Sequence, residues 1–361
     1  MRNRRPRFLA MVLMLALISG GAGALAGPVS AAPFRFSPVP WIQAAMDAAD
    51  LFGAQSVIDA VAGPSSISGG SDGRITVLLL GSDYRPRLSG TGERTDSIIF
   101  MTIDDSNHIS AISLPRDVGN VPIGPGQVFK PKINGLFKYF KKQSGGSRNV
   151  ALDKERQAFE YAFGIQIDYV AFVRFTGLER LVKQVGGVRV NVPYQIEDPS
   201  IVDARAKLQP GAKFVAGSTL ELGDDAPYCY TVGHPINWST TPNCTRALEY
   251  VRSRHGKGNN DWKRDKRQQG FIYAAMQQIS SAQLEGLRES TFANASDFYT
   301  TLPMTSADVI YMYDRVHDAT MPNQAVLQPP TYASNVKGTS KQQLKIDVVR
   351  ALFHSWFGPL S

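Results

Sequence analysis

The sequence predicts an α/β fold: a three-layer α-β-α sandwich around a mixed central sheet, built as a single enlarged domain. From about residue 75 onward, short apolar runs of buried-strand length alternate with amphipathic patterns of helical period. The chain has 361 residues, of which 43% are hydrophobic and 19% charged, so it can bury a large core. No repeat of fixed period accompanies this alternation, which argues against a solenoid.

Residues 1–33 are predicted to be a basic leader followed by a hydrophobic anchor or signal peptide. Four arginines lie within the first seven residues, and no further charged residue occurs until Arg35. The segment Val29-Ser30-Ala31 resembles a signal-peptidase site, whereas about twenty uncharged residues also suffice to span a bilayer, so cleavage and retention both stay open. In either case we expect the protein at the extracytoplasmic face of the cell membrane or secreted.

The charge and the cysteine count exclude several classes of protein. Half of the formal net charge of +8 belongs to the leader arginines, and basic residues do not interleave with aromatic ones. A nucleic acid is therefore not expected as a partner. The two cysteines are too few for a disulfide-rich scaffold or a four-cysteine zinc site, and the five histidines show no HExxH spacing.

The first elements are a connector and three strands. Residues 34–74 are expected to form the connector, which contains a short helical pattern and then a Gly-, Ser- and Pro-rich stretch. Apolar runs predict strands at Ile75–Leu80, Ser97–Asp104 and His108–Leu114. Because the turn Asp105-Ser106-Asn107 joins the last two strands, they are expected to form a hairpin.

Helices and strands alternate through the rest of the chain. A strand at Ile167–Phe175 leads into a helix at Thr176–Val185, which Gly186-Gly187 end. The other expected elements are a strand at Val188–Val192 and helices at Asn134–Lys142, Asp153–Phe163, Arg246–Arg254, Asp261–Ala282 and Ser306–Val316. We place the main domain at residues 75–284 and a C-terminal helical extension at residues 285–361.

Charged residues gather where the first three strands meet their loops. If the first strand is antiparallel to the second, the hairpin brings the chain back to the sheet edge from which it started. The residues at this edge are Asp83, Arg85, Arg94, Asp96, Arg116 and Asp117. Carboxylates and guanidinium groups would then share one site, although surface salt bridges at loop ends are the alternative interpretation.

A second cluster lies between residues 252 and 267, where seven cations accompany two acids. A run of charge is usually a solvated helix face, so the phase of the helix decides which side chains point inward. The apolar stripe at residues 272–279, extended back in steps of three and four, includes Arg264 and Arg267, whereas the neighbouring lysines fall outside it.

Arginines that point inward require an anion. A guanidinium group matches a phosphate with two parallel hydrogen bonds. In the preceding helix Arg252 follows Leu248 by four residues and so also lies on the apolar side. Inward arginines together with a few aspartates are typical of a metal-assisted pyrophosphate site.

Six short motifs in this order resemble those of the LytR-CpsA-Psr family of extracytoplasmic ligases, which move glycopolymers from polyprenyl-pyrophosphate carriers to the bacterial cell wall. The similarity runs from about Ile75 to Gln278 and includes the strand-helix-strand at 167–192. Each motif alone is weak, and the six in sequence are specific. They are Gly81-Ser82-Asp83-Tyr84-Arg85, Arg94-Thr95-Asp96, Leu114-Pro115-Arg116-Asp117, Lys132-Ile133-Asn134, Tyr250-Val251-Arg252-Ser253-Arg254-His255 and Arg264-Asp265-Lys266-Arg267-Gln268-Gln269.

The resemblance implies roles for individual residues. Asp83 and Asp96 would hold Mg²⁺, with Mn²⁺ as an alternative, and would form the catalytic set with Arg94 and Arg116. The pyrophosphate and head group would be bound by Arg85, Asp117, Lys132, Arg252, Arg254, Arg264, Arg267 and Gln268. An apolar channel between sheet and helices would take the lipid tail, with Phe137, Phe163, Phe172 and Leu181 as candidate lining residues and ordinary core as the alternative for each.

The chain departs from the family pattern at residues 223–245, an insertion that contains Cys229 and Cys244. An exported chain meets an oxidising compartment, which favours a disulfide between these two cysteines over free buried thiols. In the chain-entropy model, closing the loop with this bond would stabilise the folded state by on the order of 3 kcal/mol.

The implied activity is a metal-dependent phosphotransfer. A sugar hydroxyl of the peptidoglycan acceptor would attack the phosphorus that bears the glycan, and polyprenyl phosphate would leave. Asp83 or Asp96 is a candidate base, and the sequence does not choose between them. Two rival functions stay open: a secreted pyrophosphatase that uses water as the nucleophile, and a noncatalytic protein that binds wall polyanions.

Overall fold

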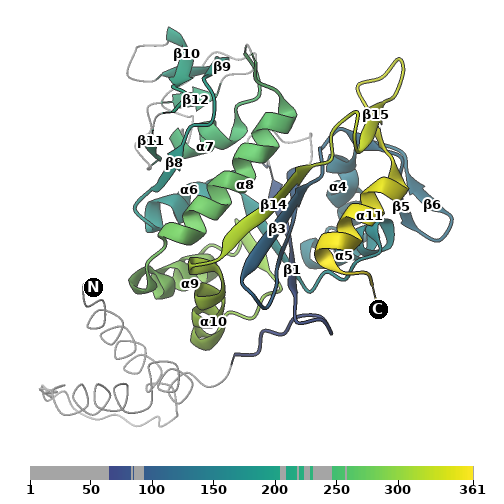
Figure 1. Cartoon of the computed structure of the whole chain (residues 1–361), viewed down its shortest axis with the longest axis horizontal. Coiled ribbons are helices and arrows are strands. Elements are labelled where there is room, and N and C mark those ends of the chain that lie inside the picture. The colour runs from purple at the N-terminus through teal and green to yellow at the C-terminus, as the bar shows by residue number, and fades with distance from the viewer. Residues whose placement is uncertain are drawn as a thin grey trace, which may run out of the picture.

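A six-stranded mixed sheet forms the middle layer of the protein, with helices on both of its faces (Figure 1). This computed structural model describes residues 65–82, 84, 93–203, 209–217, 219–222, 228–230, 246–256 and 258–360. In spatial order the strands are β13 (Phe298–Thr300), β7 (Tyr169–Arg174), β1 (Ile75–Ser82), β2 (Thr95–Ile103), β3 (His108–Ser113) and β14 (Thr320–Val326). The three-layer α/β architecture predicted from the sequence is confirmed.

The pairing of the first three strands is the one that the sequence predicts. β1 runs antiparallel to β2, with Leu80 opposite Ile98, and β2 pairs antiparallel with β3. Asn107 turns the hairpin in a left-handed conformation, with φ of 58°, which asparagine adopts more readily than most residues. After β3 the chain leaves the sheet, passes through α4 (Leu136–Gln143) and α5 (Arg148–Phe163), and returns as β7, which pairs in parallel with β1.

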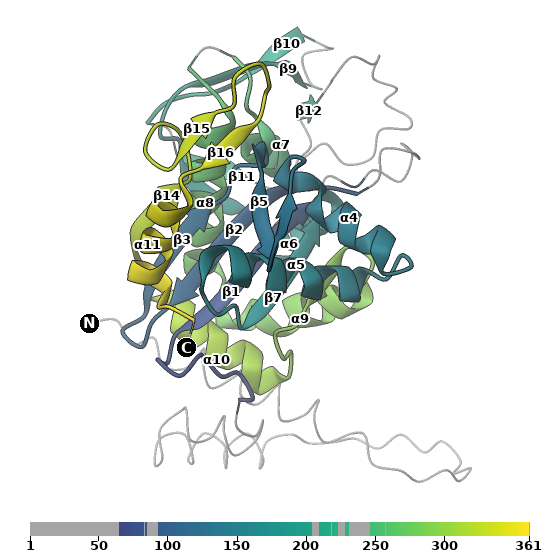
Figure 2. The ribbon, with the colours of Figure 1, turned by 90° about the vertical axis from the view of Figure 1, so that its right-hand side faces the viewer.

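The face of the sheet covered by α4 (Leu136–Gln143), α5 (Arg148–Phe163) and α11 (Ile346–Phe357) is named here the closed face; Figure 2 looks onto it. Phe100 of β2 lies at its centre with no exposed surface. Its ring meets Phe159, Phe163 and Phe353 edge to face, with ring centroids 5.4, 5.4 and 5.0 Å away. Such contacts add to the free energy gained from burial alone.

The opposite face, named here the open face, is covered by α6 (Phe175–Gln184), α8 (Asp261–Gln278) and α10 (Ser306–His317) (Figure 1). α8 begins at Asn260, whose side chain accepts a hydrogen bond from the backbone nitrogen of Lys263 at 2.9 Å. Ile272 and Met276 of α8 pack toward the sheet. This helix therefore carries Arg264, in its first turn, to the end of the sheet where β2 begins.

Small sheets and short helices surround this core. The remaining helices are α7 (Arg246–Arg252), α9 (Leu284–Ala293), η1 (Ile133–Gly135) and η2 (Ser281–Gln283). The remaining strands are β4 (Val118–Gly119), β5 (Val121–Gly124), β6 (Gln127–Phe129), β8 (Val188–Asn191), β9 (Ile196–Asp203), β10 (Gln209–Phe214), β11 (Thr219–Leu222), β12 (Tyr228–Tyr230), β15 (Ala333–Asn335) and β16 (Gln342–Leu344).

The C-terminal residues 285–361 are not a separate helical extension, which corrects the sequence prediction. They supply both edge strands of the central sheet, β13 and β14, and α11 contributes Phe353 to the core of the closed face. The sequence pattern does not predict β14, because this strand contains Pro322 and its apolar residues do not alternate regularly. An edge strand tolerates both features. The domain therefore continues almost to the C-terminus.

Several sequence predictions lie outside the described residues. These are the leader, most of the connector, Asp83, Arg85, Cys244 and the side chain of Cys229, so the proposed disulfide stays a prediction. Of the helices that the structure does describe, none is long and apolar enough to cross a membrane.

Candidate active site

Asp96, near the start of β2, anchors a polar cluster at the end of the sheet. Its Oδ2 accepts a hydrogen bond from Arg116 Nη1 at 2.9 Å, and its Oδ1 accepts one from Asn134 Nδ2 at 2.8 Å. Arg116 follows β3, so the hairpin places it next to Asp96 as the sequence analysis expects. Asn134 comes from η1, in the Lys-Ile-Asn motif.

Arg264 of α8 reaches into the same cluster and is 4% exposed. Arg264 donates hydrogen bonds from Nε at 3.0 Å and from Nη2 at 2.7 Å to Asp265 Oδ1. Its Nη1 donates to Asp261 Oδ1 at 2.9 Å, and its Nη2 approaches the backbone oxygen of Asp96 at 3.4 Å. The burial of Arg264 predicted from helix phase is therefore confirmed.

Asp261 Oδ1 is shared by three guanidinium groups. Besides Arg264, it lies 3.4 Å from Arg116 Nε and 3.4 Å from Arg254 Nη1. Lys132 is held nearby through Asp117, with 2.8 Å between Nζ and Oδ1. The cluster thus concentrates cations around a single carboxylate oxygen, an arrangement into which a phosphate group would also fit.

The carboxyl groups of the cluster differ in their affinity for protons. Burial acts to raise the pKa of Asp96, but the charge of Arg116 and the hydrogen bond from Asn134 outweigh it and hold this pKa below the ordinary value. Burial raises the pKa of Asp265 to about 6 in spite of its ion pair with Arg264. Asp96 is therefore ionised at neutral pH.

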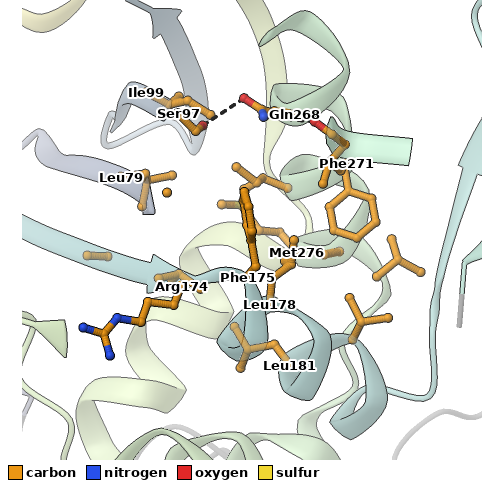
Figure 3. Close-up of a pocket in the computed structure, with 18 of the residues that line it drawn as sticks. Leu79, Ser97, Ile99, Arg174, Phe175, Leu178, Leu181, Gln268, Phe271 and Met276 are labelled. Atoms are coloured by element: carbon orange, nitrogen blue, oxygen red, sulfur yellow. Dashed lines mark hydrogen bonds between the residues drawn. The ribbon is translucent and has the colours of Figure 1, made fainter. Parts of the chain in front are cut away.

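An apolar cavity of about 430 Å³ lies beside this cluster on the open face (Figure 3). β1 and β2 contribute Leu79 and Ile99 to its wall, and α6 and α8 contribute Leu178, Phe271 and Met276, as Figure 3 shows. Apolar side chains make up most of the lining. The cavity therefore suits a hydrocarbon ligand.

Polar side chains stand at the rim of the cavity. Gln268 donates from Nε2 to the backbone oxygen of Val251 at 3.0 Å, and its Oε1 accepts from Ser97 Oγ at 2.8 Å (Figure 3). Arg252 lies over the ring of Phe175, 4.6 Å from its centroid, and also lines the cavity. Gln268 and Arg252 thus belong to the wall of the cavity as well as to the basic motifs.

Three of the four residues predicted to line the channel lie elsewhere. Phe137, Phe163 and Phe172 belong to the buried core of the closed face, and none has exposed surface. Leu181, on α6, does line the cavity. The prediction chose large aromatic residues, but strand alternation sends Phe172 to the closed face and its neighbours Ala171 and Val173 to the cavity.

Arg267 is buried, as predicted, but it does not face the phosphate cluster. Its guanidinium donates to the backbone oxygen of Tyr250 at 3.2 Å and to Asn259 Oδ1 at 3.0 Å, and also to Tyr194 and to the backbone of Ser253. It therefore fixes the end of α7 and the loop that carries Arg254. Arg94 is exposed, and its side chain pairs with no residue that the structure describes.

A second ion cluster, missed by the sequence analysis, lies at the far rim of the cavity. Glu93 is buried and binds Arg174 Nε at 2.7 Å and Lys141 Nζ at 3.0 Å. Arg174, which lines the cavity, stacks on Tyr84 at 4.0 Å from the ring centroid. No sequence period links Glu93, Lys141 and Arg174, so only the fold shows that they meet.

The donor set at Asp96 fits one position of a Mg²⁺ shell. Within the part of the chain that the structure describes, no three carboxylate, histidine or cysteine side chains gather closely enough to hold an ion. Mg²⁺ in phosphate sites commonly takes one or two carboxylates and completes its shell with water and phosphate oxygens, so an ionised Asp96 suffices as one ligand. The role of Asp83 stays a prediction.

Comparisons with known proteins identify the family of this chain. Residues 45–222 and 240–351 match the model of the LytR_cpsA_psr family. Two curated relatives are the polyisoprenyl-teichoic acid--peptidoglycan teichoic acid transferase TagV of Bacillus subtilis, 27% identical over 209 residues, and the cell wall biosynthesis protein LcpA of Corynebacterium glutamicum, 25% identical over 245 residues. These matches cover 57% and 59% of this chain but 44% and 41% of the relatives, so the chain spans less than half of their length.

Solved structures share the fold. The crystal structure of B. subtilis TagV superposes with a TM-score of 0.53 at 20% identity and covers 79% of this chain and 97% of its own. A structure described as TagT bound to LIIa-WTA gives a TM-score of 0.51 at 21% identity, with 81% and 94% covered. Because the family model matches most of its length, this protein is a member of the LytR-CpsA-Psr family.

Proposed function

We propose that this protein is a phosphotransferase that moves a glycopolymer from a polyprenyl-pyrophosphate carrier to a sugar hydroxyl of peptidoglycan. One observation carries the proposal: a partly buried guanidinium cluster adjoins an apolar cavity, and Gln268 and Arg252 lie where the two meet. A polyprenyl diphosphate requires both environments in direct succession. The names of TagV and of TagT with its bound molecule support a wall glycopolymer as the substrate class.

The arginines of the cluster would stabilise the charge that develops during transfer. The acceptor hydroxyl attacks the phosphorus that bears the glycan, its proton passes to a base, and the bond from that phosphorus to the bridging oxygen breaks. Polyprenyl phosphate leaves with the electron pair of that bond. Arg116, Arg254 and Arg264 are held in place before the substrate arrives, so little reorganisation is required.

Asp96 is better suited to bind cations than to accept the proton. Its pKa is held below the ordinary value, so its carboxylate has little affinity for a proton at neutral pH. We propose that Asp96 holds Mg²⁺ or Mn²⁺ together with Asp83. When bound, the ion would neutralise charge on the phosphate oxygens.

The proposed location is the extracytoplasmic face of the membrane. The leader supports export, and the lipid carrier, or a retained anchor, would keep the enzyme at the bilayer. At this location the bilayer would supply the polyprenyl chain that the apolar cavity is proposed to bind.

The first experiment measures transfer with a short-chain polyprenyl-pyrophosphate glycan as donor and uncross-linked peptidoglycan as acceptor. Arg264→Ala should lower transfer at least tenfold, because a charged hydrogen bond worth about 1.5–3 kcal/mol is lost. Circular dichroism of the variant must show that it is folded, because the change leaves the buried Asp265 without its partner. Lys142→Ala, which removes an exposed cation of α4, is the matched control and should leave transfer unchanged. Equal loss in both variants would contradict the proposal.

Product analysis separates the rival activities. Transfer requires an acceptor, so glycan should appear on peptidoglycan and donor should persist when the acceptor is omitted. Rapid hydrolysis of the donor without acceptor would identify a pyrophosphatase instead. Tight binding without any turnover would indicate a noncatalytic polyanion-binding protein.

The metal proposal has its own test. Excess chelator should abolish transfer, and Mg²⁺ or Mn²⁺ should restore it. Asp96→Asn should weaken this restoration, which is measured by titrating the ion against activity. Full turnover in chelator would exclude the metal-assisted reaction.

A further inference from the structure

A groove of about 1020 Å³ lies on the side of α8 away from the apolar cavity. α8 and β14 form its floor, and the segment after β8 and the loop after β14 form its sides. This volume lies at the upper end of the range of about 300–1,000 Å³ that is usual for small-molecule pockets. An extended ligand with several units therefore fits it better than a single small molecule.

Aromatic rings and side-chain amides line this groove together. Tyr194, Trp262, Tyr273 and Tyr332 are each partly exposed there. Asn260, Gln324 and Gln328 supply amides, a group that can both donate and accept hydrogen bonds. The amide of Gln278 is hydrogen-bonded to Arg189 and Ala274. A sugar ring has apolar C–H faces and hydroxyl groups that also donate and accept, so its chemistry matches both kinds of residue.

The groove is basic and carries no acidic lining residue among those the structure describes. Lys266 is exposed on α8, and Lys263 lies with Nζ 4.5 Å from the centroid of the Tyr194 ring. Arg189 adds a cation at the other end. A glycan that bears carboxylate or phosphate groups is therefore favoured over a neutral one.

Gly270 leaves the helical floor of the groove without a side chain. It lies inside α8, where glycine lowers helix stability relative to alanine, and it lines the groove. A Cβ built at this position would meet no atom of the described residues within 4 Å. Packing within the protein therefore does not require a glycine here, whereas close approach of a ligand to the helix would.

The groove also adjoins the phosphate cluster through α8. Asn260, which caps the helix, lines the groove, and the next residue, Asp261, collects the guanidinium groups of the cluster. Arg267 lines the groove and fixes the loop that carries Arg254. A chain bound along the groove would therefore approach the reacting phosphate past the first turn of α8.

We infer that this groove binds an anionic glycan chain. Two sources offer that chemistry, the wall glycan that accepts the transferred polymer and the glycopolymer of the donor itself. The assignment of the glycan to the acceptor or to the donor rests on the proposed function. The inference that the groove binds a glycan does not depend on that function.

The test measures how tightly the full-length protein binds peptidoglycan strands from which the peptides have been removed. The lactyl groups of these strands are then free carboxylates. A neutral chitin hexasaccharide should bind at least fivefold more weakly. Gly270→Leu should weaken binding of the strands at least tenfold without lowering Tm, because leucine is a good helix former. Gly270→Ala fills little of the groove and should keep binding within threefold of the original.

Trp262→Ala should also weaken binding at least tenfold. Tyr161→Ala, which removes an aromatic side chain 41% exposed on α5, is the matched control and should leave binding unchanged. Unchanged binding in both Gly270→Leu and Trp262→Ala would overturn the inference. So would binding of strands only when they carry their peptides.

Kinetics then distinguish the two sources. If the acceptor occupies the groove, Gly270→Leu raises the KM for peptidoglycan and leaves the affinity for donor unchanged. If the donor glycan occupies it, the donor affinity falls and the KM for peptidoglycan does not change. Glycan binding that responds to Gly270→Leu in a protein without transfer activity would preserve this inference while the proposed function failed.

Discussion

The two faces of the central sheet differ in packing although the same strands form both. On the closed face, Leu78 and Phe100 are fully buried beneath the helices. On the open face, the intervening residues Leu79 and Ile99 face a cavity of about 430 Å³. Because side chains alternate along a strand, one half of each strand stabilises the fold while the other half shapes a ligand site.

The comparison predicts the largest loss of stability on the closed face. Phe100→Ala should lower the free energy of unfolding by about 3–5 kcal/mol, because three packed aromatic rings lose their common partner. Leu79→Ala removes a residue that already borders empty space and should cost clearly less. Urea unfolding of both variants measures the difference, and equal losses would show that the faces are packed alike.

A buried acid gives the closed face a pH dependence. Glu155 of α5 has no exposed surface and accepts a hydrogen bond from Thr95 Oγ1 at 3.4 Å. Burial raises its pKa to about 8 from 4.5, so the folded state holds a proton that the unfolded state releases between these values. Its contribution to stability therefore falls as the pH rises from about 4.5 toward 8.

Glu155→Gln should remove this dependence. The amide has the same shape and no charge. Between pH 5 and pH 8 the free energy of unfolding of the variant should therefore rise relative to that of the original chain by on the order of 3 to 4 kcal/mol. Unfolding in urea at the two pH values measures the gain. A parallel pH dependence in both proteins would mean that Glu155 is already ionised in the folded state.

Replacing a small side chain by a larger one should lower stability on the closed face but not on the open face. Ala162 of α5 is fully buried on the closed face, so Ala162→Leu should overpack it and cost about 1–3 kcal/mol. Ala171 of β7 lines the cavity, so Ala171→Leu should leave stability unchanged or raise it. The same substitution should weaken binding of a polyprenyl pyrophosphate, because it occupies the space of the hydrocarbon chain.

The pairing of the first three strands, the helices α4, α5 and α8 and part of the site could be predicted from sequence. Strand pairing and the burial of Arg264 follow from local patterns, since hairpins and helix phase depend on nearby residues. Glu93 and Arg174, by contrast, are 81 positions apart and meet through folding alone. The prediction of channel-lining residues was wrong for three of the four, because the size of a side chain does not reveal which face of the sheet it occupies.

The smallest expected effect concerns Asp261, where the open face meets the phosphate cluster. Its Oδ1 lies near Arg116, Arg254 and Arg264 and thus occupies the position that a phosphate oxygen would take. Because this carboxyl group is partly exposed, each ion pair is worth about 1 kcal/mol or less. Asp261→Asn should therefore lower stability slightly and free the guanidinium groups for an external anion. Affinity for inorganic pyrophosphate, measured by calorimetry, should rise up to about fivefold, whereas Asp153→Asn on the exposed surface of α5 should not change it. A fall in affinity would mean that Asp261 holds the arginines in their binding geometry rather than competing with the substrate for them.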